Sequence, residues 1–145
     1  MENWLERTQL LVGEDVIKIF SEFSVAVVGL GGVGAYAAEM LVRSGIGNIL
    51  ILDSDAVSIT NKNRQLLALE STLGHQKSEV MAQRLKDINP QLNLTVIDEY
   101  LTPENVEELL SPHKIDFLVD AIDTLSPKLA LILYCVNNKL PLISS

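Results

Sequence analysis

A glycine-rich segment near the start of the chain, residues 29–34 with the sequence GLGGVG, is typical of backbone that binds phosphate. It follows a short apolar run and precedes a stretch with helical spacing. Gly29 would permit the tight turn between the two, and Gly34 would let the helix pack closely on the strand. Gly31 and Gly32 would let the backbone approach a phosphate, which the free N–H groups at the helix start would also bind. The segment therefore predicts a nucleotide site.

A carboxylate follows the next apolar run of the chain. Asp53 stands directly after residues 48–52, and a carboxylate at the end of such a strand accepts hydrogen bonds from ribose hydroxyls. With the glycine segment, it indicates a nucleotide that contains ribose. At this point an NAD-binding oxidoreductase fits as well as an enzyme that binds ATP.

A set of charged and polar side chains then favours ATP. Arg64 and Lys77 could neutralise the β- and γ-phosphates, as a leaving pyrophosphate requires. Asp123 could hold Mg²⁺, a hard cation that prefers carboxylate and phosphate oxygens. Asp55 and Asn61 lie between the ribose and phosphate candidates and complete the expected nucleotide site. Hydride transfer has no use for this set of charges.

The elements that must position these residues alternate along the chain. Short apolar runs predict strands, and apolar residues at helical spacing predict helices between them. The strands are expected at 24–28, 48–52, 93–97, 115–119 and from 141, and the helices at 8–20, 33–43, 76–88, 103–110 and 126–138. Ser126 and Pro127 would cap and open the last helix. Continuous apolar strands separated by helices predict an α/β fold with a doubly wound, mainly parallel, Rossmann-like sheet. Its carboxyl edge would gather the candidate residues.

Composition limits the class of protein. The chain has 145 residues, 48% of them hydrophobic and 21% charged, which suits one globular domain. No apolar run reaches the ~18 residues of a membrane helix, and no targeting segment is evident, so a cytoplasmic protein is expected. The single cysteine, Cys135, lies in an apolar stretch and is expected to pack in the core. The net charge of −8 is spread evenly, without a basic stripe that would indicate nucleic-acid binding.

Taken in order, these motifs resemble those of the ubiquitin-activating-enzyme-like adenylyltransferases. The resemblance covers about residues 7–145. It rests on the glycine segment, the acids at 53 and 55, NKNRQ at 61–65, Lys77, INP at 88–90 and DAID at 120–123. Within that superfamily, RTQLLVGE at 7–14 and the DAIDT segment followed by Lys128 are similar to the dehydratases that modify threonylcarbamoyladenosine in tRNA.

The resemblance implies a reaction. ATP would adenylate the carboxylate of threonylcarbamoyladenosine in tRNA, and intramolecular attack would release AMP and leave a ring. Gly32 and Asp53 would bind the adenosine part of ATP, and the phosphates and metal would be held as expected above. Arg7 would reach from one subunit into the ATP site of the other, which implies a homodimer. Ala35 stands where a serine is common in this subgroup.

Two other readings remain open. The acceptor could be the C-terminus of a ubiquitin-like sulfur-carrier protein, which the acidic balance mildly favours over tRNA. The chain could also be a dinucleotide-binding oxidoreductase. Residues 1–145 are expected to form the N-terminal part of one ATP-binding domain whose remainder follows residue 145 and would carry most of the contacts to tRNA.

Overall fold

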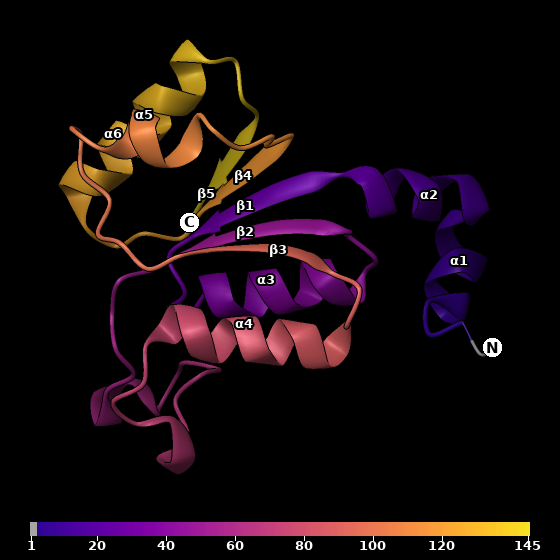
Figure 1. The fold of residues 1–145 in the computed structure, drawn as a ribbon, viewed down its shortest axis with the longest axis horizontal. Helices are drawn as coiled ribbons and strands as arrows, with labels where there is room; N and C mark the ends of the chain where they lie inside the picture. Colours follow the sequence, from indigo (N-terminus) through magenta and orange to yellow (C-terminus); the bar gives the residue numbers. More distant parts are fainter. Residues whose placement is uncertain (1–2) are drawn as a thin grey trace.

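A five-stranded, fully parallel sheet forms the centre of the molecule (Figure 1). In the computed structural model, which describes residues 3–145, the strand order is β3-β2-β1-β4-β5. The strands are β1 (Ser24–Val28), β2 (Asn48–Leu52), β3 (Asn93–Ile97), β4 (Phe117–Asp120) and β5 (Leu142–Ser144). The expected α/β, Rossmann-like class is confirmed.

Helices cover both faces of the sheet. They are α1 (Glu6–Val12), α2 (Glu14–Glu22), α3 (Gly34–Arg43), α4 (Lys77–Ile88), α5 (Val106–Leu110) and α6 (Leu125–Asn137). Figure 1 shows α3 and α4 side by side on one face, and α5 and α6 on the other. Each face buries its own apolar cluster against the sheet. Cys135 is fully buried in the cluster under α6, where burial raises the pKa of its thiol to about 11, as expected of a core residue.

The direction of winding reverses at β1. From β1 the chain moves outward through β2 to β3 with α3 and α4 on one face. It then crosses to the other side of β1, where β4 and β5 follow with α5 and α6 on the opposite face. The carboxyl ends of β1 and β4 therefore diverge into helices on opposite faces, and a crevice opens between them.

The N-terminal helix is divided, unlike the single helix expected over 8–20. Gly13 has φ 90° and ψ 160°, so the backbone leaves the helical region there and α2 begins on a new axis. Glycine adopts this conformation at little steric cost.

No helix among residues 3–145 is long and apolar enough to cross a membrane.

The start of α6 also differs from the expectation. Ser126 and Pro127 do not cap and open it, because Thr124 is the N-cap and the helix begins at Leu125. Proline is accommodated as the third helical residue because that N–H has no partner within the helix anyway. The strand expected at 115–119 runs over Phe117–Asp120 instead, and α5 is shorter than the expected 103–110.

The segment between β2 and α4 contains two short 3₁₀ turns that the apolar pattern does not predict, η1 (Ile59–Asn61) and η2 (Glu70–Thr72). Polar side chains stabilise the first of them. Asn61 Oδ1 accepts a hydrogen bond from the Ser58 amide at 2.9 Å, and the Thr60 amide donates to Ser58 Oγ at 3.3 Å. The Arg64 amide donates to the Asn61 carbonyl at 3.1 Å, so this turn leads directly into Arg64.

An ion-pair network joins α3 to α4 and permits a stability prediction. The carboxylate of Glu39, 11% exposed, accepts hydrogen bonds from Arg84 and, at 2.9 Å, from Arg43. The bond from Arg84 holds the pKa of Glu39 below its ordinary value against the opposing effect of burial. Glu39→Gln is expected to lower the free energy of unfolding by about 1–2 kcal/mol at neutral pH, a value reduced because both arginines are partly solvated.

The sign of the pH dependence follows from the lowered pKa of Glu39. The contribution is present above the ordinary glutamate pKa and is lost as the pH falls through the lower, folded value. Urea unfolding of the full chain at neutral and acidic pH measures this loss. Glu14→Gln is the matched control, since Glu14 and Lys18 form an ion pair with both side chains 66% exposed. An equal loss of stability at both pH values would contradict the assignment.

Candidate functional site

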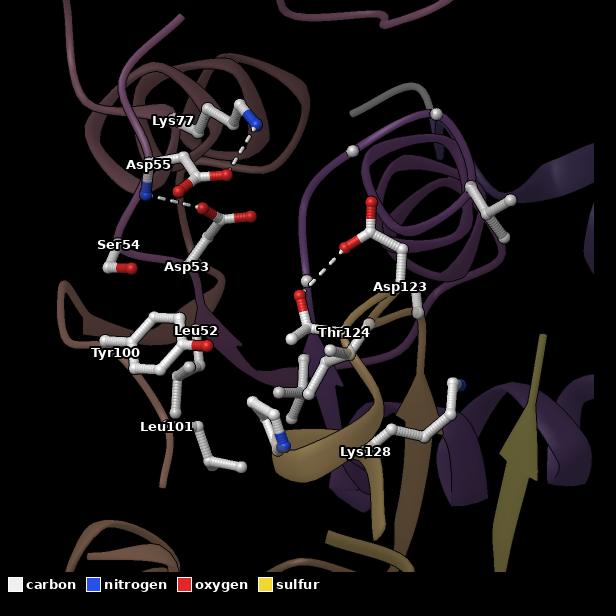
Figure 2. Close-up of a pocket in the computed structure, with 18 of the residues that line it drawn as sticks. Leu52, Asp53, Ser54, Asp55, Lys77, Tyr100, Leu101, Asp123, Thr124 and Lys128 are labelled. Atoms are coloured by element: carbon white, nitrogen blue, oxygen red, sulfur yellow. Dashed lines mark hydrogen bonds and ion pairs between the residues drawn. The ribbon is translucent and has the colours of Figure 1, made fainter. Parts of the chain in front are cut away.

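A cavity of about 690 Å³ opens at the carboxyl ends of the strands, where the winding reverses. Its volume is in the range of sites that bind small molecules. It brings together most of the residues singled out from the sequence: Gly29, Gly31, Gly32, Asp53, Asp55, Asn61, Arg64, Lys77 and Asp123. Figure 2 shows Lys77 and Asp55 pointing toward one another on one side, and Asp123 on the other.

Two glycines of the 29–34 segment are required by packing. Gly29 has φ +93°, and a Cβ there would lie 2.7 Å from the carbonyl oxygen of Ala121, at the end of β4. A Cβ on Gly34 would overlap the carbonyl oxygen of Gly29. Gly34 does not line the cavity, so it permits the close approach of α3 to the turn rather than contact with a ligand.

The other two glycines of the segment have space around them. A Cβ on Gly31 would meet only the end of Gln65 at 3.6 Å, and a Cβ on Gly32 would meet Arg64 no closer than 3.7 Å. These are ordinary van der Waals distances, so internal packing does not require glycine at either position. Because both residues line the cavity, side chains there would occupy the space that a phosphate would need.

Asp53 connects β2 to the glycine segment. Its Oδ2 accepts a hydrogen bond from the Leu30 amide at 2.6 Å, and its Oδ1 accepts one from the Asp55 amide at 2.8 Å. Burial raises the pKa of Asp53 above its ordinary value, and the two amide bonds oppose this shift. Each carboxylate oxygen retains acceptor capacity for a ribose hydroxyl.

Lys77 supplies a buried cation at the first residue of α4. The side chain is only 6% exposed, and Nζ lies 3.2 Å from Oδ2 of Asp55, whose own side chain is 69% exposed. The aspartate can therefore turn into solvent when an anionic ligand takes its place beside the ammonium. The arrangement suits a phosphate-binding lysine whose position is fixed before the ligand arrives.

Arg64 belongs to the segment that follows η1, and it lines the cavity. Its Nη1 donates to the carbonyl of Thr60 at 3.1 Å and to Asn63 Oδ1 at 2.9 Å, and its stem runs beside Gly32. The remaining guanidinium N–H groups stay available for phosphate oxygens. Asn61 also lines the cavity, but its Oδ1 accepts the bond from Ser58 that holds the turn.

Asp123 extends into the cavity from the turn between β4 and α6. Among the residues that the structure describes, its carboxylate has one side-chain hydrogen bond, with Thr124 Oγ1 at 3.4 Å. No group of three or more histidines, cysteines or acids is placed to hold a metal within residues 3–145. Mg²⁺ does not need such a group, because one or two carboxylates with substrate phosphates and water commonly complete its shell. The donor set therefore fits a metal that arrives with a nucleotide.

Arg7 is the one predicted catalytic residue that the cavity does not contain. It lies on α1, where its side chain is exposed. Figure 1 shows α1 beyond the amino ends of the strands, opposite the edge where the cavity opens. Within a single chain, Arg7 therefore has no access to the site.

The cavity has lining residues that the sequence motifs did not indicate. The segment after β3 contributes Glu99, Tyr100 and Leu101, and the start of α6 contributes Pro127. Lys128, which belongs to the motif set but had no expected role, also lines the cavity. Tyr100 and Leu101 lie near Leu52 (Figure 2) and offer an apolar surface of the kind that a nucleobase packs against. The sequence indicated these two residues only by their position, since residues that follow a parallel strand lie at the same edge of the sheet as Asp53.

Comparison with known proteins gives a consistent result. The model of the ThiF family matches residues 5–145. The tRNA threonylcarbamoyladenosine dehydratase of Escherichia coli is 46% identical, over 98% of this chain and 54% of its own length. The protein of the same name from Bacillus subtilis is 41% identical, over 100% of this chain and 57% of its own length. The chain thus spans about half the length of these curated relatives.

A solved structure extends the comparison to three dimensions. The crystal structure of E. coli tRNA N6-threonylcarbamoyladenosine dehydratase in complex with ATP superposes with a TM-score of 0.92 at 46% identity. The match covers 95% of this chain and 56% of that one. The resemblance seen in the motifs is therefore confirmed by the family model, the relatives and the fold. The chain belongs to the ThiF family.

Proposed function

We propose that this protein uses ATP to adenylate a carboxylate, and that its acceptor is threonylcarbamoyladenosine in tRNA, which it cyclises by dehydration. The observation that carries the proposal is the cavity itself, which places a buried lysine, an arginine and an acid around an open glycine backbone. The names of the two relatives support the choice of acceptor over a sulfur-carrier protein. Such a substrate would locate the reaction in the cytoplasm.

The first chemical step needs positioning and charge neutralisation. An oxygen of the acceptor carboxylate attacks the α-phosphorus of ATP, an acyl adenylate forms, and pyrophosphate leaves. The amides of the glycine segment hold phosphate oxygens, while Lys77 and Arg64 neutralise the charge that develops on the leaving group. Asp53 orients the ribose. The carbamoyl oxygen of the same nucleoside then attacks the activated carbonyl carbon, the bond from that carbon to AMP breaks, and a carbamoyl N–H loses its proton as the ring closes and AMP leaves.

Mg²⁺ is the metal that the donor set fits. Asp123 would hold it beside the phosphates, and it would supply charge stabilisation to the departing pyrophosphate. The oxygens available there come from Asp123, Thr124 and the nucleotide.

We also infer a homodimer in which Arg7 acts on the partner's site. The position of Arg7 on an exposed helix face, away from its own cavity, supports this reading. An arginine supplied by a second chain can stabilise charge on phosphates, as arginine fingers do in other phosphoryl-transfer enzymes.

The experiment that tests the function uses the full chain with ATP and two tRNA preparations. One carries threonylcarbamoyladenosine and the other lacks it, and nucleoside analysis after digestion detects the cyclised product. Release of AMP and pyrophosphate only with the modified tRNA would support the proposal. Adenylation of a sulfur-carrier C-terminus instead would establish the second acceptor. Thermal stabilisation by NAD but not by ATP would contradict the proposal and favour the third function, a dinucleotide-binding oxidoreductase.

A pH dependence of nucleotide binding follows from Asp53. Only the carboxylate form accepts hydrogen bonds at both oxygens, so binding is complete above the raised pKa of Asp53 and is lost as the pH falls through it. Affinity for ATP is therefore expected to begin its fall at a higher pH than an ordinary aspartate would cause. Fluorescence titration with an ATP analogue across the acidic range measures this.

Two variants isolate the contribution of Asp53. Asp53→Asn is expected to bind ATP more weakly at neutral pH and to lose the part of the pH dependence that this carboxyl causes. Asp98→Asn, an exposed acid after β3, is the control and should retain the full profile. If Asp53→Asn kept the same profile as the unmodified protein, the titrating group would be another one.

A further inference from the structure

An ion pair with a fully buried carboxylate lies at the base of the turn that carries Asp123. Asp120, the last residue of β4, is fully buried, and its Oδ2 accepts hydrogen bonds from Lys128 Nζ and from Ser144 Oγ, each at 2.6 Å. Together with Ser144 the ion pair joins three elements, because Asp120 ends β4, Lys128 belongs to α6 and Ser144 ends β5. Removing a carboxylate from water is costly unless it is paired, so the buried Asp120 carboxylate needs Lys128 and Ser144 at hydrogen-bonding distance.

The ammonium of Lys128 has no donor left for a ligand. A lysine has three N–H donors. Nζ of Lys128 lies 2.6 Å from Asp120 Oδ2, 3.1 Å from Ser144 Oγ and 3.1 Å from the Ser145 carbonyl oxygen. Lys128 lines the cavity, yet its ammonium is directed toward Asp120 and the end of β5. The geometry therefore assigns it a different role from that of Lys77.

The turn above the pair depends on Asp120. Oδ1 of Asp120 accepts a hydrogen bond from the Ile122 amide at 3.1 Å, which fixes the backbone just after the strand. On its other side the turn is pressed against the glycine segment, where the Ala121 carbonyl leaves no space for a side chain at position 29. Asp123, at the tip, has only its bond to Thr124 within residues 3–145. Its position is consequently set by the backbone of the turn.

We propose that Lys128 is a positioning residue for the nucleotide site. By holding Asp120 against the end of β5, it fixes the turn and thereby the place of the Asp123 carboxylate beside the bound phosphates. The inference rests on the proposed function, since it concerns how the same site receives a magnesium–ATP complex. Lys128 would act on the site through Asp120 and the turn.

The test compares Lys128→Met with Lys114→Met in the full chain. Both variants remove one ammonium, but Lys114 is exposed and precedes β4 at the opposite end of the strand. Calorimetric titration measures the affinity for ATP with and without Mg²⁺. Lys128→Met is expected to lose most of the affinity gained from Mg²⁺ while its metal-free affinity changes by less than about threefold. Lys114→Met should match the unmodified protein in both.

Turnover provides the second measurement. A displaced carboxylate at a phosphoryl-transfer site is expected to lower kcat by about ten- to a hundredfold, and KM for ATP in the presence of Mg²⁺ should rise by the same factor as the affinity lost in the titration. The titration needs no turnover, so it tests Lys128 even if the proposed acceptor is wrong. Absence of adenylation by the unmodified protein, with the titration as expected, would overturn the function and leave the positioning role standing.

A double variant excludes simple unfolding. Lys128→Met leaves the Asp120 carboxylate buried without its cation, and this could unfold the chain. Asp120→Asn combined with Lys128→Met removes both charges and retains the oxygen that accepts from Ile122. A folded double variant with the same loss of the magnesium effect would support the proposal. A folded double variant with the full magnesium effect would overturn it.

Discussion

Replacing Lys77 by alanine is expected to slow ATP-dependent adenylation by about two to three orders of magnitude, while the fold is retained. The ammonium is 6% exposed, so its interaction with a phosphate is only weakly screened by water. Asp55, the partner left behind, is 69% exposed and can be solvated at little cost. The measurement is pyrophosphate release at saturating acceptor, together with a thermal unfolding curve.

Arg64→Ala and Asp123→Ala are expected to give losses of the same order, since each also removes a contact to charge that builds up in the transition state. Lys62→Ala serves as the matched control. Lys62 lies in the same segment as Arg64, but its ammonium pairs with Glu70 and does not line the cavity. Near-normal pyrophosphate release from any one of the three site variants would remove that residue from the mechanism.

Mixing two inactive variants, Arg7→Ala and Arg64→Ala, is expected to restore activity. In a dimer whose sites exchange Arg7, a mixed dimer holds one intact site and one doubly altered site. Random exchange in an equal mixture would therefore recover about a quarter of the unmodified activity, because half of the dimers are mixed and each has one working site of two. Each variant alone should remain inactive at every concentration.

The control for this experiment is a mixture of two single variants, Arg64→Ala and Lys77→Ala, whose altered residues line the same cavity. Variants of the same site should not complement one another, because every mixed dimer still has one defect in each site. Subunit exchange must be verified separately, for example by mass spectrometry of differently tagged chains. If exchange occurs without recovery, Arg7 acts within its own subunit or has no part in catalysis.

The strands were the most predictable part of the fold. β1, β2 and β3 have the expected bounds. The runs SVAVV and NILIL of β1 and β2 are almost entirely apolar, as burial on both faces of a parallel sheet requires, whereas β3 is a partly exposed edge strand. The helix ends were less predictable. Gly13 reads as a tolerated residue within an amphipathic stretch, and only its backbone angles reveal that one helix has become two. Caps depend on local geometry that apolar spacing does not encode.

The residues of the site also differ in how well the sequence predicted them. Residues that are unusual for their position, such as Lys77 and Asp123, could be recognised by charge and spacing. Tyr100 and Leu101 could not, because tyrosine and leucine are ordinary in any segment and acquire meaning only when the fold brings them beside Leu52. The pair of Asp120 and Lys128 was visible as a motif, but the saturation of the ammonium is a fact of three-dimensional contact.

The hydrogen bond between Asp53 and the Leu30 amide also has a thermodynamic consequence. A glycine-rich segment is the most flexible kind of backbone, and immobilising it upon binding would oppose nucleotide affinity by lost conformational entropy. Here the neighbouring strand already restrains the segment in the absence of nucleotide. Much of that entropy is therefore lost when the chain folds rather than when the ligand arrives. Amide hydrogen exchange at Leu30 should accordingly be slow in the free protein, and ATP should slow it only slightly further.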